Sequence, residues 1–241
     1  MLLHTNPLFL VYFGTAKDKL MQAEYLNLPP TPILELAPFS TLKKTMQLQQ
    51  LFFAHQVHGD QGIVVDKKIL ELVRPFKSDS DFLVTDQERV GIGVMTADCL
   101  PIVFHDRVRN VVGVAHAGWR GAVLGVGVKA MERMYETFGS KPENIAVFFG
   151  PSAKMCCYKV NEEFQSNLEG FADIDRVLQQ HGADWYFDLP MFNKIQLESA
   201  GISKNAFQLN YNCCTMCDDS FYSHRLQGES AGRQMTVVCL T

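Results

Sequence analysis

The sequence predicts a single α/β domain. Short apolar runs rich in β-branched residues alternate with segments of helical periodicity, most clearly where Val111–Ala115 is followed by apolar residues three and four apart up to Phe138. Of the 241 residues, 47% are hydrophobic and 20% are charged, so the chain can bury a sizeable core. No repeat of fixed period, low-complexity tract or linker divides it into parts.

Apolar runs bounded by turn-forming residues predict the strands. Pro101 has no N–H to donate to a ladder, so we expect it at the start of a strand, on an edge strand or at a bulge. The first expected strand is Leu8–Phe13. The others are Leu51–Val57, Gly62–Asp66, Phe82–Thr85, Val90–Met95, Leu100–His105, Val111–Ala115, Ile145–Phe149, Ala206–Tyr211 and Thr236–Leu240.

Apolar residues at helical spacing predict the helices, and glycines mark two of their ends. The expected helices are Thr41–Gln50, Val123–Phe138 before Gly139, Val160–Leu168, and Asp188–Ala200 before Gly201. Weak patterning predicts loops elsewhere, and the prolines Pro29, Pro30 and Pro32 exclude a long helix before Pro38. The expected irregular stretches are Gly14–Pro38, Lys67–Asp81 and Gly170–Asp184, with a solvated hairpin at Phe221–Gln234.

Charge and hydropathy narrow the choice of partners. The net charge of −4 excludes a general electrostatic surface for nucleic acid, although it permits a local basic pocket. Leu8–Phe13 is too short to span a bilayer, and it lacks the preceding basic residue and following cleavage pattern of a signal peptide. We therefore expect a cytoplasmic protein with no membrane or nucleic-acid partner.

The seven cysteines do not resemble a secreted disulfide framework. Cys156–Cys157 and Cys213–Cys214 are adjacent pairs, and adjacent cysteines rarely bridge each other. Cys214 and Cys217 have the C-x-x-C spacing of a redox or zinc motif, but no second such pair exists. We expect the cysteines other than Cys99 to be structural thiols.

Three segments place metal-binding side chains beside turn residues. These are Ala54–Asp60 (AHQVHGD), Thr96–Pro101 (TADCLP) and His116 at the end of its strand. Two histidines and one cysteine form a set that zinc uses in catalytic sites, leaving a fourth position for water or substrate. If the preceding strand runs through the first segment, His55 and His58 point to opposite faces, so only one of them faces the site.

The same residues permit two other kinds of site. If no metal is bound, Cys99 and His116 can act as a nucleophile and its general base. Two histidines, a cysteine and a weak axial methionine describe a blue-copper site, for which Met95 and Met155 are candidates. A non-catalytic metal-binding module is the alternative outside enzymes.

A bound zinc ion lowers the pKa of its water to about 7 and so makes hydroxide available at neutral pH. Such a hydroxide attacks an amide, an ester or the amino-bearing carbon of a purine, and a carboxylate then shuttles the proton. Asp98 and Asp60 are the nearest carboxylates in sequence, although an Asp in such turns is more often a capping residue.

Arg120 follows His116 by four residues, within the glycine-containing segment Gly118–Gly121. A helix N-terminus and a guanidinium together suit an anion, so we expect Arg120 to bind phosphate through paired hydrogen bonds. The alternative is that Arg120 packs on Trp119 or pairs with a carboxylate. Further cationic groups stand in the segment expected to be a solvated hairpin, namely His224, Arg225 and Arg233.

These motifs resemble one known family along most of the chain. The family was long catalogued as laccase-domain or polyphenol-oxidase proteins, and its members are now described as purine nucleoside phosphorylases with adenosine deaminase activity. The matching motifs are HQVHGD (55–60), SDFLVT (80–85), TADCLPIVF (96–104), VAHAGWRG (114–121), GPSAKMCCYKV (150–160), CCT (213–215) and FYSHRLQGESAGRQ (221–234).

The resemblance implies zinc ligands at His58, Cys99 and His116, and it alone selects His58 over His55. It implies phosphorolysis of adenosine, inosine and methylthioadenosine, and deamination of adenosine. It also implies a layered arrangement of mixed β-sheets flanked by helices, similar to bacterial cysteine-hydrolase toxins. Together with the residue chemistry given above, this makes Cys99, His116, Arg120 and Asp98 the candidate catalytic residues.

The resemblance leaves two further activities open. Some bacterial relatives are assigned to peptidoglycan editing, in which a wrong amino acid is cleaved from a cell-wall precursor, and the older name implies a copper-dependent oxidase. The chain departs from the family at Tyr12–Ala16, where an Arg and paired glycines are usual, and any anion contact of that Arg is lost. His224 replaces the usual Tyr, which is a mild change.

Overall fold

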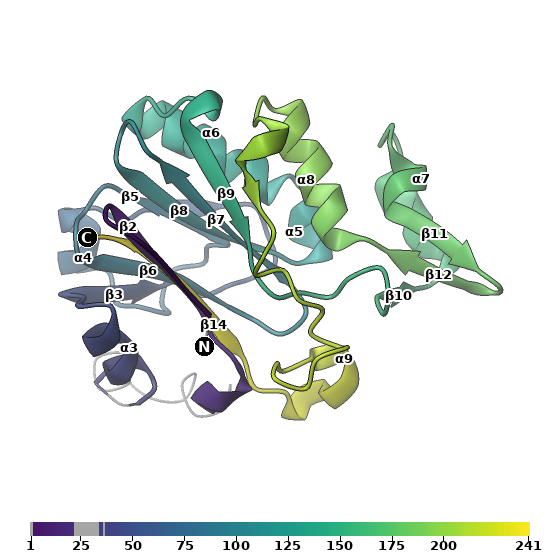
Figure 1. Ribbon diagram of the computed structural model, residues 1–241, viewed down its shortest axis with the longest axis horizontal. Coiled ribbons are helices and arrows are strands. Elements are labelled where there is room, and N and C mark those ends of the chain that lie inside the picture. The colour runs from purple at the N-terminus through teal and green to yellow at the C-terminus, as the bar shows by residue number, and fades with distance from the viewer. Residues whose placement is uncertain (1, 22–33, 36) are drawn as a thin grey trace.

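Two mixed β-sheets packed face to face form the centre of the protein (Figure 1). The computed structural model describes residues 2–21, 34–35 and 37–241. In this part of the chain a five-stranded sheet has the order β1 (Leu2–Asn6), β2 (Phe9–Phe13), β14 (Gln234–Leu240), β6 (Val90–Thr96), β3 (Gln50–Phe53). The facing six-stranded sheet has the order β13 (Phe207–Gln208), β9 (Ile145–Phe149), β7 (Leu100–Asp106), β8 (Val111–Ala117), β5 (Phe82–Thr85), β4 (Gly62–Val64).

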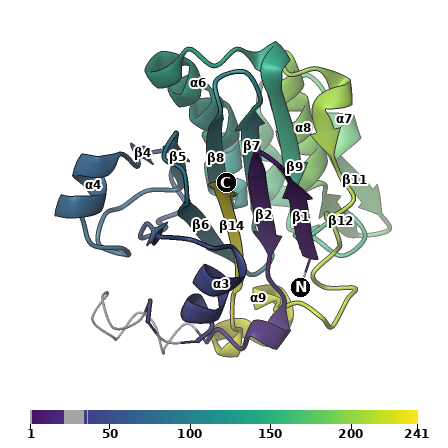
Figure 2. The same cartoon turned by 60° about the vertical axis from the view of Figure 1, so that its left-hand side comes forward.

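Helices cover the outer faces of both sheets, so the chain has four layers (Figure 2). On the six-stranded sheet lie α5 (Trp119–Val123), α6 (Val126–Phe138) and α8 (Leu189–Ser199). On the five-stranded sheet lies α3 (Phe39–Thr45). The other helices of the described residues are α4 (Lys67–Leu72), α7 (Ile174–Val177), α9 (His224–Gln227) and the 3₁₀ turns η1 (Ala16–Asp18), η2 (Pro142–Asn144), η3 (Glu162–Leu168), η4 (Lys204–Ala206) and η5 (Gly228–Ser230).

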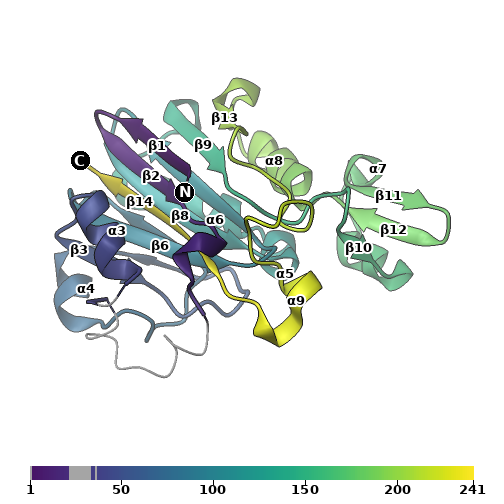
Figure 3. The ribbon, with the colours of Figure 1, turned by 60° about the horizontal axis from the view of Figure 1, so that its bottom comes forward.

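A small antiparallel sheet stands apart from the two large ones (Figure 3). It has the order β10 (Lys159–Val160), β12 (Asp184–Phe187), β11 (Leu178–His181). The prediction of a layered α+β arrangement with mixed sheets is confirmed, since each large sheet contains both parallel and antiparallel pairs. The similarity to cysteine-hydrolase toxins stays a prediction.

The β7–β8 hairpin is central to the six-stranded sheet and positions two candidate site residues. All residues of both strands are buried, and Asp106 accepts hydrogen bonds from the Val108 and Arg109 backbones to form the turn. The register pairs Pro101 with His116, and Cys99 directly precedes β7. Because a one-residue slip would turn every side chain to the opposite face and disrupt the packing of both covered faces, the register is fixed, and with it the relative positions of the two site residues.

Several predicted elements need correction. Leu8–Phe13 is the second strand, because Leu2–Asn6 forms a strand that pairs with it. The expected loop Lys67–Asp81 begins with α4, since Asp66 caps that helix by accepting a hydrogen bond from Ile69 N–H. The weakly patterned Gly170–Asp184 contains α7, β11 and the first residue of β12, where apolar packing against the η3 and α8 side chains compensates for the weak periodicity.

Other elements are shorter than expected or differ in type. The strand expected at Leu51–Val57 ends at Phe53, the one at Ala206–Tyr211 is reduced to Phe207–Gln208, and Val160–Leu168 contains a 3₁₀ helix rather than an α-helix. The expected hairpin at Phe221–Gln234 contains α9, which Ser223 caps, and η5. The prolines Pro29, Pro30 and Pro32 lie outside the described residues.

No helix in the described ranges is long and apolar enough to cross a membrane. The expectation of a cytoplasmic location stays a prediction.

The helix expected at Val123–Phe138 is interrupted near its start. Gly125 has φ +79°, a left-handed conformation that separates α5 from α6, whereas the predicted end at Gly139 is confirmed. We expect Gly125→Ala to lower the free energy of unfolding by about 1 kcal/mol, because a Cβ at Gly125 meets no neighbouring atom and only backbone strain is added. Gly125→Asn should lower the free energy of unfolding less, because asparagine tolerates the left-handed conformation. Urea denaturation measures both variants, and equal losses would contradict the role of this conformation.

Candidate metal centre and active site

His58, Cys99 and His116 come together at one end of the β7–β8 hairpin. Their ligand atoms all lie within 4.8 Å of one another, and the two imidazole centroids are 4.8 Å apart at an interplanar angle of 74°. His116 is buried, Cys99 is partly buried and His58 is exposed. The structure therefore brings together the three residues that the sequence predicted as ligands.

His58 reaches this position from a turn rather than from a strand. Its φ is +61°, so the alternation argument that separated His55 from His58 does not apply. His55 instead contacts Asp79, with Nδ1 and Oδ1 2.8 Å apart, and both side chains are solvent-exposed. His55 is not part of the three-residue group.

The carboxylate of Asp81 holds two of the three candidate ligands, and the sequence analysis gave it no role. Its Oδ1 accepts hydrogen bonds from His58 N–H at 3.0 Å and from His116 Nδ1–H at 2.8 Å. Its Oδ2 accepts hydrogen bonds from Val57 N–H and Gly59 N–H. The signals in the sequence were its place directly before a buried strand and within the family motif SDFLVT (80–85).

The electrostatics of the group favour charged forms despite burial. Burial alone would raise the pKa of Cys99, but the charge of His116 and hydrogen bonds from both histidines lower this pKa to about 6. Burial opposes a charged His116, yet Cys99 and Asp81 raise its pKa to about 9. Burial acts against the Asp81 carboxylate as well, but His116 keeps its pKa below the usual range.

The donor set fits a soft or borderline transition metal. A thiolate and two imidazoles suit zinc or copper, and the Asp81 contact leaves Nε2 of His116 available as a ligand. Gly118 permits the close packing around these ligands, because a Cβ there would lie 2.9 Å from His58 and 3.0 Å from Cys99 Sγ. Of the two axial methionines considered for copper, Met95 lines the adjoining pocket and Met155 does not.

A pocket of about 330 Å³ opens beside the three ligands. Apolar wall is provided by Phe76 and Met95, among others. Apart from the three candidate ligands, the titratable and cationic side chains that line the pocket are His55 and, from the C-terminal segment, His224, Glu229 and Arg233. The volume and the mixed lining are typical of a small-molecule site.

The carboxylates of Asp98 and Asp60 do not line the pocket, and each is bound to side chains or backbone groups elsewhere. Asp98 is buried with φ +80°, and it accepts hydrogen bonds from Thr215 Oγ1 at 2.7 Å, Ser223 Oγ at 3.0 Å and Arg225 N–H at 2.7 Å. Asp60 forms an ion pair with Lys129. Both carboxylates therefore serve as anchors between segments.

Arg120 lies outside the pocket lining. Its guanidinium stacks on Trp119, 4.5 Å from the ring centroid, as in the alternative considered for this residue. Arg225 is likewise engaged, by the Lys159 carbonyl and the Tyr158 ring. Arg233 is the arginine that lines the pocket within the described residues, and its Nη1 also donates hydrogen bonds to the Ala231 and Gly232 carbonyls. The sequence had indicated it only as one of a cationic group.

Comparison with known proteins places the chain in a family. Residues 37–241 match the family described as multi-copper polyphenol oxidoreductase laccase. The chain belongs to this family. The match begins after the N-terminal segment in which the sequence departs from the family pattern.

Individual relatives carry other names. A protein of Clostridium acetobutylicum named purine nucleoside phosphorylase is 30% identical, over 82% of this chain and 80% of that protein. A protein from an unknown prokaryotic organism named adenosine deaminase RL5 is 29% identical, over 80% and 76% respectively. The crystal structure of Neisseria meningitidis protein NMB0706 has a similar fold, with a TM-score of 0.78 at 24% identity over 99% of this chain and 98% of that one.

Loss of the Asp81 charge should weaken metal binding. In Asp81→Asn we expect the affinity for the metal to fall about 10- to 100-fold, because the carboxylate orients His116 and increases its basicity. Asp79→Asn, which alters the exposed contact with His55, is the matched control and should bind metal normally. Competition with a metal chelator measures both, and equal affinities in the two variants would contradict this role for Asp81.

Proposed function

We propose that this protein is a zinc-dependent purine nucleoside enzyme. It cleaves adenosine, inosine and methylthioadenosine with phosphate, which yields the base and ribose 1-phosphate or methylthioribose 1-phosphate. It also deaminates adenosine to inosine. The observation that carries the proposal is a single pocket in which the His58, Cys99 and His116 group adjoins an apolar wall and a cationic side chain. The names of its relatives support this substrate class.

Zinc held by His58, Cys99 and His116 would supply a Lewis acid at the pocket wall. The chain's own residues prepare that position. Asp81 accepts a hydrogen bond from Nδ1–H of His116, which directs the other ring nitrogen of His116 toward the ligand group. It also accepts a hydrogen bond from His58 N–H, which fixes the turn that carries His58. Burial of His116 and partial burial of Cys99 limit the access of bulk water to these ligands.

The purine base has apolar contacts available at Phe76 and Met95. Deamination requires a proton for the departing ammonia, and Glu229 and His224 are the titratable groups of the pocket wall in the C-terminal segment. We assign Asp98, which the sequence suggested as a proton carrier, a positioning role. Its contacts with Thr215, Ser223 and Arg225 hold the segment that presents His224 to the pocket.

A second function is favoured by one observation. The depressed pKa of Cys99 beside the raised pKa of His116 describes a thiolate–imidazolium pair, which is the condition for a cysteine nucleophile when no metal is bound. Such a pair suits an amidase acting on a peptidoglycan precursor. Chelation distinguishes the two functions, because it abolishes the zinc reaction and spares the cysteine reaction.

A nucleoside assay tests the proposed function. With phosphate, we expect adenosine to give adenine and ribose 1-phosphate, and the inosine formed by deamination to give hypoxanthine and ribose 1-phosphate, so that ribose 1-phosphate equals the sum of the two bases. With or without phosphate, adenosine and water should give inosine and ammonia. Both activities should vanish after dialysis against a chelator and return with zinc. Absence of nucleoside turnover, with release of an amino acid from a cell-wall precursor or copper-dependent oxidation of a phenol, would contradict the proposal.

We expect the binding of phosphate to depend on Arg233 rather than on Arg120. Arg233 lines the pocket, whereas Arg120 stacks on Trp119 outside it. In Arg233→Lys we expect the KM for phosphate to rise about tenfold, because lysine cannot provide the paired hydrogen bonds of a guanidinium. Deamination, which needs no phosphate, should change less.

Arg120→Lys is the matched control and should keep a normal KM for phosphate. Steady-state kinetics of both reactions on the folded, zinc-loaded variants decide between the two residues. A raised KM in Arg120→Lys with a normal one in Arg233→Lys would restore the expectation from the sequence.

A further inference from the structure

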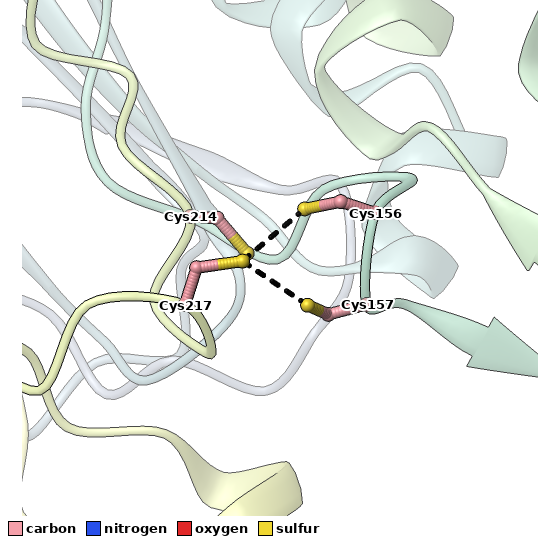
Figure 4. Close-up of side chains that lie close together, drawn as sticks. All are labelled: Cys156, Cys157, Cys214 and Cys217. Atoms are coloured by element: carbon pink, nitrogen blue, oxygen red, sulfur yellow. Dashed lines mark hydrogen bonds between the residues drawn. The ribbon is translucent and has the colours of Figure 1, made fainter.

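Four cysteine side chains converge outside the pocket (Figure 4). Cys156 and Cys157 come from the loop between β9 and β10, and Cys214 and Cys217 from the segment between β13 and α9. Their four sulfur atoms all lie within 4.8 Å of one another. The Sγ atom of Cys217 lies 3.5 Å from that of Cys156 and 3.2 Å from that of Cys157.

The spacing of the sulfur atoms matches a metal site. Four thiolates about 2.3 Å from a tetrahedral zinc ion stand about 3.8 Å from one another. The separations from Cys217 Sγ to Cys156 Sγ and Cys157 Sγ, 3.5 Å and 3.2 Å, are somewhat shorter than this value, and all the sulfur atoms lie within 4.8 Å of one another. The arrangement is therefore compact enough for one ion to contact all four sulfurs after small side-chain rotations.

Backbone hydrogen bonds hold the two loops together independently of the sulfurs. Ser152 N–H donates to the Cys213 carbonyl at 3.0 Å, and Thr215 N–H donates to the Ser152 carbonyl at 3.1 Å. Asn212 Nδ2–H donates to the Gly150 carbonyl at 2.7 Å. The four cysteines are thus brought together by a backbone that is already ordered, which lowers the entropic cost of binding an ion.

The backbone around Cys214 is arranged as in a metal-binding turn. Its carbonyl accepts a hydrogen bond from Cys217 N–H at 3.2 Å, which brings the two side chains of the C-x-x-C sequence to one side.

We propose that Cys156, Cys157, Cys214 and Cys217 bind a structural zinc ion, separate from the centre at His58, Cys99 and His116. A tetrahedral set of four thiolates selects zinc or iron, and a complete set leaves no open position for a substrate. Zinc replaces the thiol protons on binding, and no oxidation is needed. The missing second half of the C-x-x-C motif is the adjacent pair Cys156–Cys157.

This ion would stabilise the segment of the pocket wall that carries His224. Thr215, between two of the ligands, donates a hydrogen bond to Asp98, and Asp98 also binds Ser223 and the Arg225 backbone. Ser223 directly precedes His224, which lines the pocket. The cysteine site would therefore stabilise the segment that carries His224 without contacting the substrate.

Metal stoichiometry of the full-length chain tests the proposal. Purified with reductant and zinc, the wild type should contain about two zinc ions per chain. Cys217→Ser should contain about one, and so should His58→Ala, because each removes a ligand from a different site. Cys213→Ser is the matched control, since Cys213 neighbours Cys214 but is outside the group, and should retain both ions.

Two further measurements test the site directly, and the first of them uses the wild type alone and so does not depend on folding of a variant. Thiol alkylation of the wild type should spare Cys156, Cys157, Cys214 and Cys217 until a chelator removes the ion. Cobalt substitution should add the intense visible bands of a tetrathiolate complex, which persist in His58→Ala and vanish in Cys217→Ser. An unchanged zinc content in Cys217→Ser, iron in place of zinc, or a disulfide involving Cys217 in the reduced and zinc-supplied protein would overturn the proposal.

Discussion

Asp81 carries a buried negative charge, which is unfavourable unless hydrogen bonds or an opposite charge compensate it. The compensation comes from the backbones of Val57, His58 and Gly59 and from the ring of His116. One carboxylate accepts hydrogen bonds both from the turn at Val57–Gly59 and from the ring of His116. The left-handed backbone of His58 and the orientation of His116 are therefore fixed together. Any displacement of one ligand would leave part of this charge unpaired, and so the site is held rigidly.

The third ligand is positioned by the sheet. Cys99 precedes β7, whose register with β8 is determined by complete burial of both strands between helices and the second sheet. Gly118, just after β8, leaves the space that His58 and Cys99 occupy. The core thus sets the positions of Cys99 and His116, and the Asp81 network adds His58 from a surface turn.

Periodicity predicted the central strands β5 to β9 and helix α8 because their local apolar patterns agree with the final packing. The ligand trio was predictable from chemistry and family resemblance. The role of Asp81 was not, because it depends on contacts between segments far apart in sequence. For the same reason the sequence indicated Arg120, which is close to His116 along the chain, whereas Arg233 reaches the pocket only through the fold.

The C-terminal segment from Asn212 to Arg233 has little regular structure of its own, yet it supplies His224, Glu229 and Arg233 to the pocket. Such a segment loses much conformational entropy on folding and has few ladder hydrogen bonds to offset the loss. Its order depends on polar contacts, chiefly those of Asp98, and on the cysteine group where it meets the loop of Cys156 and Cys157. The two ligand sets therefore differ in kind. The set of three adjoins a pocket and suits chemistry, whereas the set of four closes on itself and suits the stabilisation of the wall that this chemistry requires.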